Sequence, residues 1–240
     1  MARYDIVIPH WGQEGLTDIC RLCLDSVADA GGDFRLILVD NGSEDSERLQ
    51  PQLDRMDHVV IRNSENLGFI RATNQGMQFS TAPFVALLNN DTLVPPGWLT
   101  ALEQPFRDVP NVGLSGPLTD TTASWQGQWK KRNGGGDLLL APGRMLAFFC
   151  VLIRREVIDE IGYLDESYGV GFGDDDEYCR RAEEAGFRLG LCQDLKVSHR
   201  HRTSFQVRYT PEEIAKMQAE AMRRFRLSKG VYDGPRKTHI

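Results

Sequence analysis

Residues 84–98 (FVALLNNDTLVPPGW) join the pattern of a buried strand to three polar side chains that could bind a ligand. The apolar run Phe84–Leu88 ends at Asn89, Asn90 and Asp91, and two prolines and a glycine follow. Two amides and a carboxylate at this point form either an ordinary turn or a site for a cation or a polar ligand. Three other polar clusters occur, at residues 40–43 (DNGS), 173–177 (GDDDE) and 199–201 (HRH).

The acidic run at residues 174–177 needs a physical reason, because four neighbouring carboxylates repel one another. At the start of a helix, the helix dipole offsets this repulsion by only about 0.3–1 kcal/mol for each carboxylate. A solvated helix start is the simplest explanation of the run. Beside a cleft, the same charge density indicates a bound cation, a proton-transfer role, or both.

Asp91 and His199 are the expected ligands of a divalent cation. A carboxylate oxygen and an imidazole nitrogen suit Mn²⁺ or Mg²⁺, and they leave coordination positions open for phosphate oxygens. A lone histidine is more often an ordinary surface residue. His199, however, follows a β-rich run and precedes a second histidine and two arginines, so we expect it to contact a metal or an anion.

The elements that would position these residues alternate between strands and helices. In the first half, strands are expected at 4–8, 35–39, 59–61 and 83–88, and helices at 15–29 and 66–80. Ser43 is expected to cap a further helix. This alternation predicts βαβ units and a parallel sheet that is buried on both faces. Because ligands bind beyond the carboxyl ends of such strands, three of the polar strand ends should meet at one edge.

The second half has a weaker pattern. Short strands are expected at 112–116, 144–155, 187–191 and 195–197, and helices at 156–161, 174–185 and 210–226. The last helix begins with a capping box, TPEE at 210–213. Residues 119–137 read as a long loop in which Trp125 and Trp129 either anchor the loop to the core or close over a sugar as a lid. We find no linker, so we predict one domain.

Bulk composition argues against several classes of protein. The chain has 240 residues, a formal net charge of −6 and a pI near 5.4, which is opposite to the charge of most nucleic-acid-binding proteins. The basic clusters at 130–132 and 223–224 are short. No apolar run is long enough to span a membrane, and no signal peptide is evident, so we expect a cytoplasmic protein. Cys20 and Cys23 have helical spacing with apolar residues and are expected to be core thiols.

Seven motifs occur in an order that indicates a family. They are DNGS at 40–43, NLGFIRATNQG at 66–76, LLNNDT at 87–92 with PGW at 96–98, LIRR at 152–155, IGYLDE at 161–166, DD at 174–175 with Arg181, and VSH at 197–199. In this order the chain resembles the family 2 glycosyltransferases of the GT-A fold, from about Tyr4 to His201. The nearest branch is rhamnosyltransferase-like, in which NND replaces the more usual DxD. The resemblance implies a Rossmann-like, mostly parallel α/β sheet between helices, with a C-terminal helix.

The resemblance implies that the first half of the chain holds a nucleotide-sugar donor. Pro9 and Asp40 would line the nucleobase pocket, with Asp40 accepting a hydrogen bond from the base. Arg71 would lie near the nucleoside and its phosphates, and the two asparagines of NND would contact the ribose or the sugar. The expected donor-binding residues are Pro9, Asp40, Asn41, Arg71, Asn89, Asn90 and Asp91.

The resemblance also implies the catalytic groups. Asp91 and His199 would hold Mn²⁺ or Mg²⁺, which neutralises charge on the leaving diphosphate. Asp175 would be the catalytic base, and Asp174 would bind the acceptor or support the base. The register of the acidic run leaves Asp176 as a third candidate for the base. Direct displacement on the face opposite the leaving group would invert the anomeric centre.

Three positions depart from the family pattern. His10-Trp11-Gly12 stands where many members carry a small or aromatic residue followed by asparagine, which affects the contact to the base. Asp174 replaces the more common glutamate and has a shorter reach. Phe148-Phe149 stands where many members carry small residues near the acceptor, which affects the size and type of acceptor.

Taken together, the sequence predicts a metal-dependent inverting glycosyltransferase that uses a UDP-, dTDP- or GDP-sugar and a carbohydrate or glycoconjugate acceptor. Residues 1–92 would be the nucleotide-binding half, 93–205 the acceptor-binding and catalytic half, and 206–240 a C-terminal helix and tail. That helix would pack on the core, pair two subunits as a homodimer, or contact the inner face of a membrane, and we expect packing.

Two alternatives stay open from the residues alone. A nucleotidyltransferase would carry a glycine-rich, arginine-bearing phosphate loop after the first strand, where this chain reads PHWGQEG. A nucleotide-sugar-binding protein without activity would have lost an acidic position, whereas Asp91, Asp174 and Asp175 are all present. A dehydrogenase is disfavoured because no GxGxxG opens the first helix.

Overall fold

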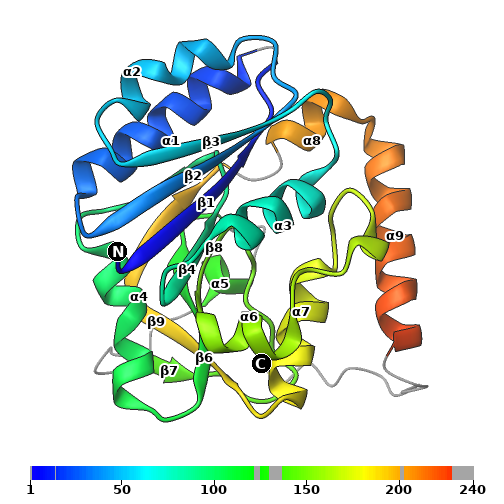
Figure 1. Ribbon diagram of the computed structural model, residues 1–240. Coiled ribbons are helices and arrows are strands. Elements are labelled where there is room, and N and C mark those ends of the chain that lie inside the picture. The colour runs from blue at the N-terminus through cyan, green and yellow to red at the C-terminus, as the bar shows by residue number, and fades with distance from the viewer. Residues whose placement is uncertain (1, 14, 122–124, 130–136, 201–202, 229–240) are drawn as a thin grey trace.

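The computed structural model describes residues 2–13, 15–121, 125–129, 137–200 and 203–228 (Figure 1). Within these residues the centre is a nine-stranded sheet with the order β3-β2-β1-β4-β8-β6-β9-β5, and β7 also pairs with β9. The strands are β1 (Tyr4–His10), β2 (Phe34–Asn41), β3 (His58–Asn63), β4 (Phe84–Leu88), β5 (Thr92–Leu93), β6 (Val112–Thr119), β7 (Asp137–Leu139), β8 (Cys150–Arg154) and β9 (Arg188–His199). The helices are α1 (Leu16–Ala30), η1 (Ser46–Leu49), α2 (Gln50–Leu53), α3 (Phe69–Phe79), α4 (Trp98–Asp108), α5 (Trp125–Gln128), α6 (Arg155–Ile161), η2 (Glu166–Tyr168), α7 (Asp174–Glu184), α8 (Thr203–Arg208) and α9 (Pro211–Ser228).

The sheet is mixed, but most strands share one direction. β3, β2, β1 and β4 pair in parallel, β8 runs antiparallel between β4 and β6, and β9 pairs in parallel with β6. Six of the nine strands therefore point the same way, as the sequence predicts. The carboxyl ends of β1, β2, β4 and β9 consequently lie at one edge of the sheet.

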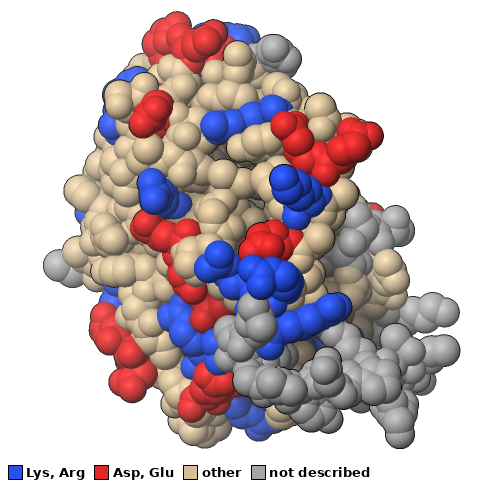
Figure 2. Space-filling view, turned by 90° about the vertical axis from the view of Figure 1, so that its right-hand side faces the viewer, with Lys and Arg blue, Asp and Glu red and all other residues tan. Residues whose placement is uncertain are grey.

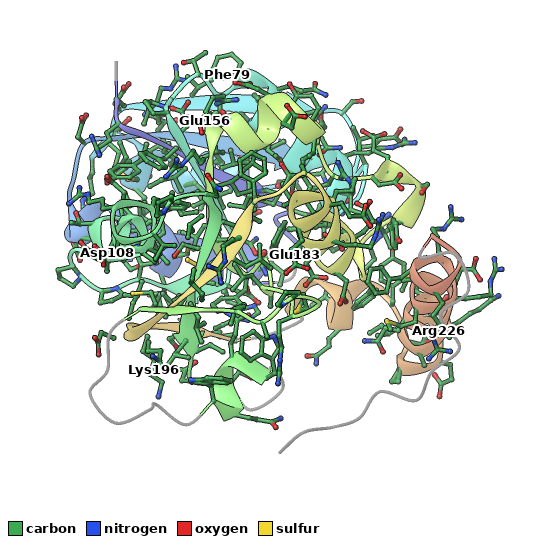
Figure 3. All side chains as sticks on the ribbon, turned by 90° about the horizontal axis from the view of Figure 1, so that it is seen from below. Phe79, Asp108, Glu156, Glu183, Lys196 and Arg226 are labelled. Atoms are coloured by element: carbon green, nitrogen blue, oxygen red, sulfur yellow. The ribbon has the colours of Figure 1, made fainter. Side chains whose placement is uncertain are left out.

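Helices cover both faces of the sheet (Figure 1). Successive strand residues point to opposite faces. On β1, Ile6 and Ile8 pack with α1, α2 and α4, and Val7 packs with α3 on the other face, where α6 and α7 also lie. Side chains fill the space on both sides of the sheet (Figure 3). The result is a three-layer α/β/α sandwich.

Helix α3 comes unusually close to the sheet at Gly76. A Cβ atom added there would lie 2.3 Å from Val7 Cγ1, far inside van der Waals contact. Only glycine fits at this position, because the helix backbone rests directly on β1 and β2. The close approach fixes the depth at which α3 lies on the sheet.

Some expectations about local structure were wrong. The strand expected at 144–155 forms only over Cys150–Arg154, and the loop expected at 119–137 contains α5 and the start of β7. Ser43 does not cap a helix, because its Oγ accepts a hydrogen bond from the Gly12 N–H at 2.7 Å, and helical structure begins only at Ser46. The two strands expected at 187–191 and 195–197 form the single strand β9. Gln193, which lies between the two expected strands, is buried, and its amide oxygen accepts a hydrogen bond from Trp129 Nε1 at 3.0 Å.

The C-terminal helix α9 packs on the core at the outer side of the α3 and α7 layer (Figures 1 and 3). Its capping box is present, since the Glu213 N–H donates to Thr210 Oγ1 at 3.3 Å and the Thr210 N–H donates to Glu213 Oε2 at 2.8 Å. Three of its side chains are buried against the body of the protein: Ile214, Ala221 and Phe225. These contacts place its inner face against α7 and the loop before it.

The surface charges, the hydrophobicity of the helices and the cysteines also bear on the class of protein. Acidic and basic side chains alternate over the face shown in Figure 2. Among the described residues, no helix is both long and apolar enough to cross a membrane. Cys20 and Cys23 are free and fully buried, and burial raises the pKa of the Cys23 thiol to about 12, so both behave as core residues.

Candidate active site

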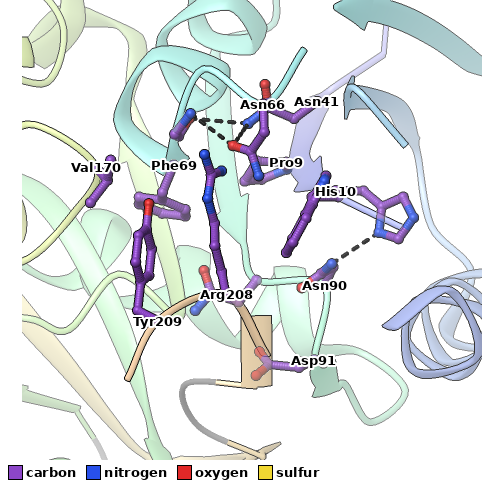
Figure 4. A pocket seen from close by; sticks show the side chains of 13 residues that line it. Pro9, His10, Asn41, Asn66, Phe69, Asn90, Asp91, Val170, Arg208 and Tyr209 are labelled. Atoms are coloured by element: carbon purple, nitrogen blue, oxygen red, sulfur yellow. Dashed lines mark hydrogen bonds between the residues drawn. The ribbon is translucent and has the colours of Figure 1, made fainter. Parts of the chain in front are cut away.

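The carboxyl ends of β1, β2 and β4 form a pocket at one edge of the sheet (Figure 4). Arg208 and Tyr209, at the end of helix α8, also line this pocket. The residues that line it are Pro9, His10, Trp11, Asn41, Asn66, Gly68, Phe69, Asn89, Asn90, Asp91, Val170, Arg208 and Tyr209. Five of the seven residues expected to bind the donor are in this set, and Asp40 and Arg71 are not.

Asn41 organises the wall of the pocket through its amide. Its Nδ2 donates to Asn66 Oδ1 at 3.0 Å and to the Gly68 carbonyl at 3.2 Å. Its Oδ1 accepts from Asn63 Nδ2 and from the Leu67 N–H, each at 3.0 Å. All hydrogen-bonding groups of this side chain are thus used to hold the loop before α3 against the end of β2.

Asp40 and Arg71 both lie outside the pocket lining. Asp40 is buried, accepts from the Ser43 N–H at 3.0 Å, and pairs with Arg62 at 3.0 Å. Arg71 is mostly exposed on α3 and pairs with Glu166 at 3.3 Å. Asp40 thus supports the turn after β2, and Arg71 pairs with Glu166 at the protein surface.

His10 and Asn90 form a second fixed pair. The Asn90 amide Nδ2 donates to His10 Nδ1 at 3.0 Å (Figure 4). Burial lowers the pKa of His10 to about 4, although the negative charges of Asp40 and Asp45 act in the opposite direction. His10 is therefore neutral near pH 7, and its Nδ1 is free to accept the hydrogen bond that orients Asn90.

Asp91 and His199, 108 positions apart in the chain, meet because β5 pairs with the end of β9. Thr92 lies opposite His199 in that ladder, and the Arg200 N–H donates to the Asp91 carbonyl at 3.1 Å. Asp91 Oδ1 and His199 Nε2 are 3.2 Å apart, and both side chains are almost buried. The His199 ring also stacks on Phe149, with 4.9 Å between ring centroids. Backbone pairing and ring stacking thus hold this pair in position.

The Asp91–His199 pair suits a divalent cation. A carboxylate oxygen and an imidazole nitrogen lie together, and the buried Asn89 Oδ1 has no hydrogen-bond partner among the described residues. This set of O and N atoms is the kind that Mn²⁺ accepts. No group of three or more histidine, cysteine, aspartate or glutamate side chains in the described ranges is arranged to hold a metal. Beyond these side chains, a cation at Asp91 and His199 could take oxygen ligands from a substrate or from water.

A second, larger cavity of about 620 Å³ adjoins the first. Asn89 and Phe69 line both cavities, and His199 lines the second while Asp91 lines the first. Asp174, Asp175 and Asp176 form part of the wall of the second cavity. The Asp91–His199 pair therefore lies at the junction of the two cavities.

Two carboxylates of this wall, those of Asp174 and Asp175, have raised pKa values. Burial raises the pKa of Asp174 to about 6, and the negative charge of Asp176 adds to the effect. Burial also raises the pKa of Asp175 well above its ordinary value, together with the charges of Asp174 and Asp176. The Asp175 carboxylate also accepts from the Asp176 N–H at 2.9 Å. A carboxylate with a raised pKa is a better proton acceptor, so these groups are suited to general base catalysis.

The loop 169–173 (GVGFG) links the two cavities. The Val170 carbonyl accepts from the Phe69 N–H at 3.1 Å and Val170 lines the first cavity, whereas Phe172 and Gly173 line the second. Phe172 has a φ of 76°, an uncommon value for a residue with a side chain, and Gly173 follows with 73°. Strained backbone of this kind is frequent at functional sites. Here it aims the acidic start of α7 at the cavity.

Sequence reasoning missed Arg208 and Tyr209. The Arg208 guanidinium lies 5.4 Å from the ring centroids of both Trp11 and Tyr209, and it lines the first cavity (Figure 4). Arg208 places a positive charge in the lining of this pocket, whereas Arg71, which was expected near the donor, is not among the described lining residues. The arginines after His199 gave a weak signal, but the position of Arg208 depends on how the chain returns after β9.

The tryptophans of the long loop are anchored where the structure describes them. Trp125 Nε1 donates to the Met145 carbonyl at 3.1 Å, Trp129 Nε1 donates to Gln193, and the two rings contact edge to face. Trp125 also lines the second cavity. Residues 130–136, with the basic triplet and the three glycines, lie outside the described residues, and so does His201, so the lid stays a prediction.

Solved structures of other proteins resemble this chain in fold. The GT-A fold is shared with several solved structures. A mannosyltransferase from Pyrobaculum calidifontis, in complex with GDP-Man and Mn²⁺, aligns at a TM-score of 0.65 and 16% identity, over 92% of this chain and 64% of that one. TarS residues 1–349 from S. aureus, in complex with UDP-GlcNAc, aligns at 0.64 and 14% identity, over 94% of this chain and 66% of that one.

The family follows from sequence. The model of glycosyl transferase family 2 matches residues 5–162, so the chain belongs to that family. The pre-mycofactocin glycosyltransferase of Mycobacterium tuberculosis is 27% identical over 185 residues, which is 72% of this chain and 39% of that protein. Human polypeptide N-acetylgalactosaminyltransferase 18 is 25% identical over 223 residues, which is 78% of this chain and 36% of that protein. The chain thus spans less than two fifths of the length of these relatives.

Proposed function

We propose that this chain transfers a sugar from a nucleotide-diphosphate sugar to an acceptor hydroxyl, with inversion at the anomeric carbon. The observation that carries the proposal is the junction of the two cavities. The first has the amides and the cation to hold a nucleotide diphosphate, the second has basic carboxylates, and Asp91 and His199 lie between them. Solved structures of the same fold in complex with GDP-Man and Mn²⁺ or with UDP-GlcNAc support this proposal.

In the donor cavity, Asn90 would contact the ribose or the sugar, because its amide is oriented by the neutral His10. Arg208 would pair with the diphosphate, which is a strong contact for a guanidinium. Asp91 and His199 would hold Mn²⁺ or Mg²⁺, with the diphosphate oxygens among the remaining ligands. When bound, that ion would stabilise the charge that develops on the diphosphate.

In the acceptor cavity, Asp175 would take the proton from the acceptor hydroxyl. The acceptor oxygen forms a bond to the anomeric carbon, the bond from that carbon to the diphosphate oxygen breaks, and the nucleoside diphosphate leaves. Because the attack comes from the side of the second cavity, opposite the diphosphate, the configuration at the anomeric carbon inverts. Asp174 would keep Asp175 basic through its charge and would orient the acceptor.

Calorimetry with UDP, GDP, dTDP and their sugars, with and without Mn²⁺, tests the donor site. We expect one nucleotide to bind tightly to the wild type and at least tenfold more weakly either without Mn²⁺ or in Asp91→Ala. Asp175→Asn should bind the same nucleotide unchanged and lose transfer by about 10²–10⁴-fold. Nucleotide binding that ignores both Mn²⁺ and Asp91 would refute the metal-dependent assignment. A retained anomeric configuration, read by NMR of the product, would refute inversion.

A further inference from the structure

Apolar side chains make up much of the described wall of the second cavity. Away from the three carboxylates, its wall is made by Met145, Phe148, Phe172 and Met222, with the indole of Trp125 at the side. Its size of about 620 Å³ is that of a site for a medium-sized small molecule. These residues come from four separate parts of the chain, which are the segments before β8 and before α7, the region of α5, and α9.

The polar side chains among the described residues of the cavity wall fall into two groups. Asn89 and His199 lie at the junction with the first cavity, and the carboxylates line the start of α7. Among the described residues of the remaining wall, Gln218 on α9 is the single side chain with a polar head. A buried sugar ring presents several hydroxyl groups, and each one left without a partner costs free energy. The described side chains of this part of the wall can satisfy few of them.

The charge of the cavity also constrains the reacting end of the acceptor. Asp174, Asp175 and Asp176 are neighbours in the wall, and burial together with their mutual repulsion raises the pKa values of Asp174 and Asp175. A phosphate or carboxylate on the acceptor would add another negative charge to this group. A neutral hydroxyl avoids that cost and can donate its proton to a carboxylate oxygen.

The apolar walls combine a rigid side with adaptable sides. Phe148 is buried and contacts Tyr178 edge to face, with 5.8 Å between centroids. Met145 and Met222 are only partly buried and belong to different elements. Methionine side chains are flexible and adapt to irregular apolar ligands. An apolar ring or chain could therefore lie on Phe148 and Phe172 and be enclosed by the methionines.

We propose that the acceptor is a neutral alcohol or phenol with an apolar body, such as an aryl or alkyl group, whose hydroxyl points at the carboxylates of α7. This inference rests on the proposed transferase function and makes it more specific. Met222 and Gln218 on α9 are the residues expected to set the acceptor range, because they face the cavity and carry no other function in the site.

The test uses the whole chain with Mn²⁺ and the nucleotide sugar selected by calorimetry. 2-Naphthalenemethanol and 1-octanol are the apolar probes, and D-glucose, maltose and glycerol 3-phosphate are the polar ones. Transfer is followed by mass spectrometry, and binding of 2-naphthalenemethanol by saturation-transfer NMR with UDP or GDP present. We expect kcat/KM for at least one apolar probe to exceed that for each polar probe by tenfold or more.

Matched variants on one helix separate acceptor binding from folding. Met222→Gln should weaken the use of the apolar probe by about five- to tenfold and leave nucleotide binding unchanged. Met217→Gln, the same change on α9 at a position outside the cavity lining, should alter neither. Gln218→Leu should improve the apolar probe by a few fold, which a purely structural role of α9 would not produce.

The outcomes separate this inference from the proposed function. If no nucleotide sugar binds, the transferase function itself fails. If nucleotide sugars bind, but kcat/KM is higher for glucose, maltose or glycerol 3-phosphate than for both apolar probes, the apolar acceptor is refuted. The transferase function would still hold. Equal effects of Met222→Gln and Met217→Gln would also refute the apolar acceptor.

Discussion

Replacing Asp174 by asparagine should stabilise the protein at neutral pH, although the residue lies in the proposed catalytic cavity. Asp174 is buried, and burial raises its pKa from 3.8 to about 6. A carboxyl whose pKa is higher in the folded state is more favourable there when protonated, so its stabilising contribution is complete below about pH 4 and is lost as the pH rises through 6. At about 1.4 kcal/mol for each tenfold change in proton affinity, the ionised group destabilises the fold by roughly 3 kcal/mol at pH 8.

Asparagine removes this charge and nearly keeps the shape. It has one accepting oxygen instead of two, and the backbone near Phe172 and Asp174 donates to the carboxylate, so about 1 kcal/mol of hydrogen bonding is lost. The net gain at pH 8 is therefore about 2 kcal/mol, which should raise the melting temperature by about 4–8 °C in a chain of this size. Near pH 4 the gain should vanish or become slightly negative.

Urea unfolding of the wild type and of Asp174→Asn at pH 4 and pH 8 checks this expectation. Asp159→Asn, at an exposed position of α6, is the matched control and should change stability by less than about 0.5 kcal/mol. Transfer activity should fall in Asp174→Asn while stability rises, because the charge that keeps Asp175 basic is gone. If Asp174→Asn destabilises the protein equally at both pH values, the carboxyl is not held in a desolvated site and its proposed role fails.

Three further changes test other parts of the structure. Arg208→Ala should weaken binding of UDP or GDP about tenfold in calorimetry and reduce its salt dependence, and unchanged binding would remove Arg208 from the donor site. Gly76→Ala should lower the free energy of unfolding by about 2 kcal/mol or more in urea, because the new methyl group meets Val7, and a neutral effect would show that α3 can move away. Arg3 lowers the pKa of Glu103 to about 2, so this carboxylate stabilises the fold above pH 4.5 and the effect is lost as the pH falls towards 2. Glu103→Gln should accordingly cost roughly 2–3 kcal/mol at pH 7 and little at pH 2.5, and a cost independent of pH would contradict the ion pair.

The first half of the fold could be predicted because its signals are local. Alternating apolar runs and helical spacing mark β1 to β4, α1 and α3 within a few residues of their observed bounds. The Ser43 cap failed because the Gly12 N–H, 31 positions away, takes the Ser43 oxygen. β9 was predicted as two strands. It continues through Gln193, whose buried amide oxygen accepts a hydrogen bond from Trp129, 64 positions away. Both errors come from tertiary contacts that local patterns do not contain.

The candidate site divides in the same way. Polar residues that directly follow strands, such as Asn41, Asn90 and Asp91, were predictable because the edge of a parallel sheet gathers them. Arg71 was expected near the donor from its motif, but its side chain turns to Glu166 on the outside of α3. Arg208 reaches the pocket only through the path of the chain after β9. Motif order thus indicates the edge of the sheet where the candidate site lies, and the path of the chain after β9 brings Arg208 to the same pocket.

The attachment of α9 has a consequence for how this protein can change over evolutionary time. Ile214, Ala221 and Phe225 are the buried side chains of α9 among its described residues. Gln218 and Met222 of the same helix line the second cavity. Neither side chain belongs to the described lining of the first cavity, which contains Asp91. Mutations at these two positions can therefore drift through populations with little penalty to folding, and each one offers selection a differently shaped cavity beside an unaltered reaction centre.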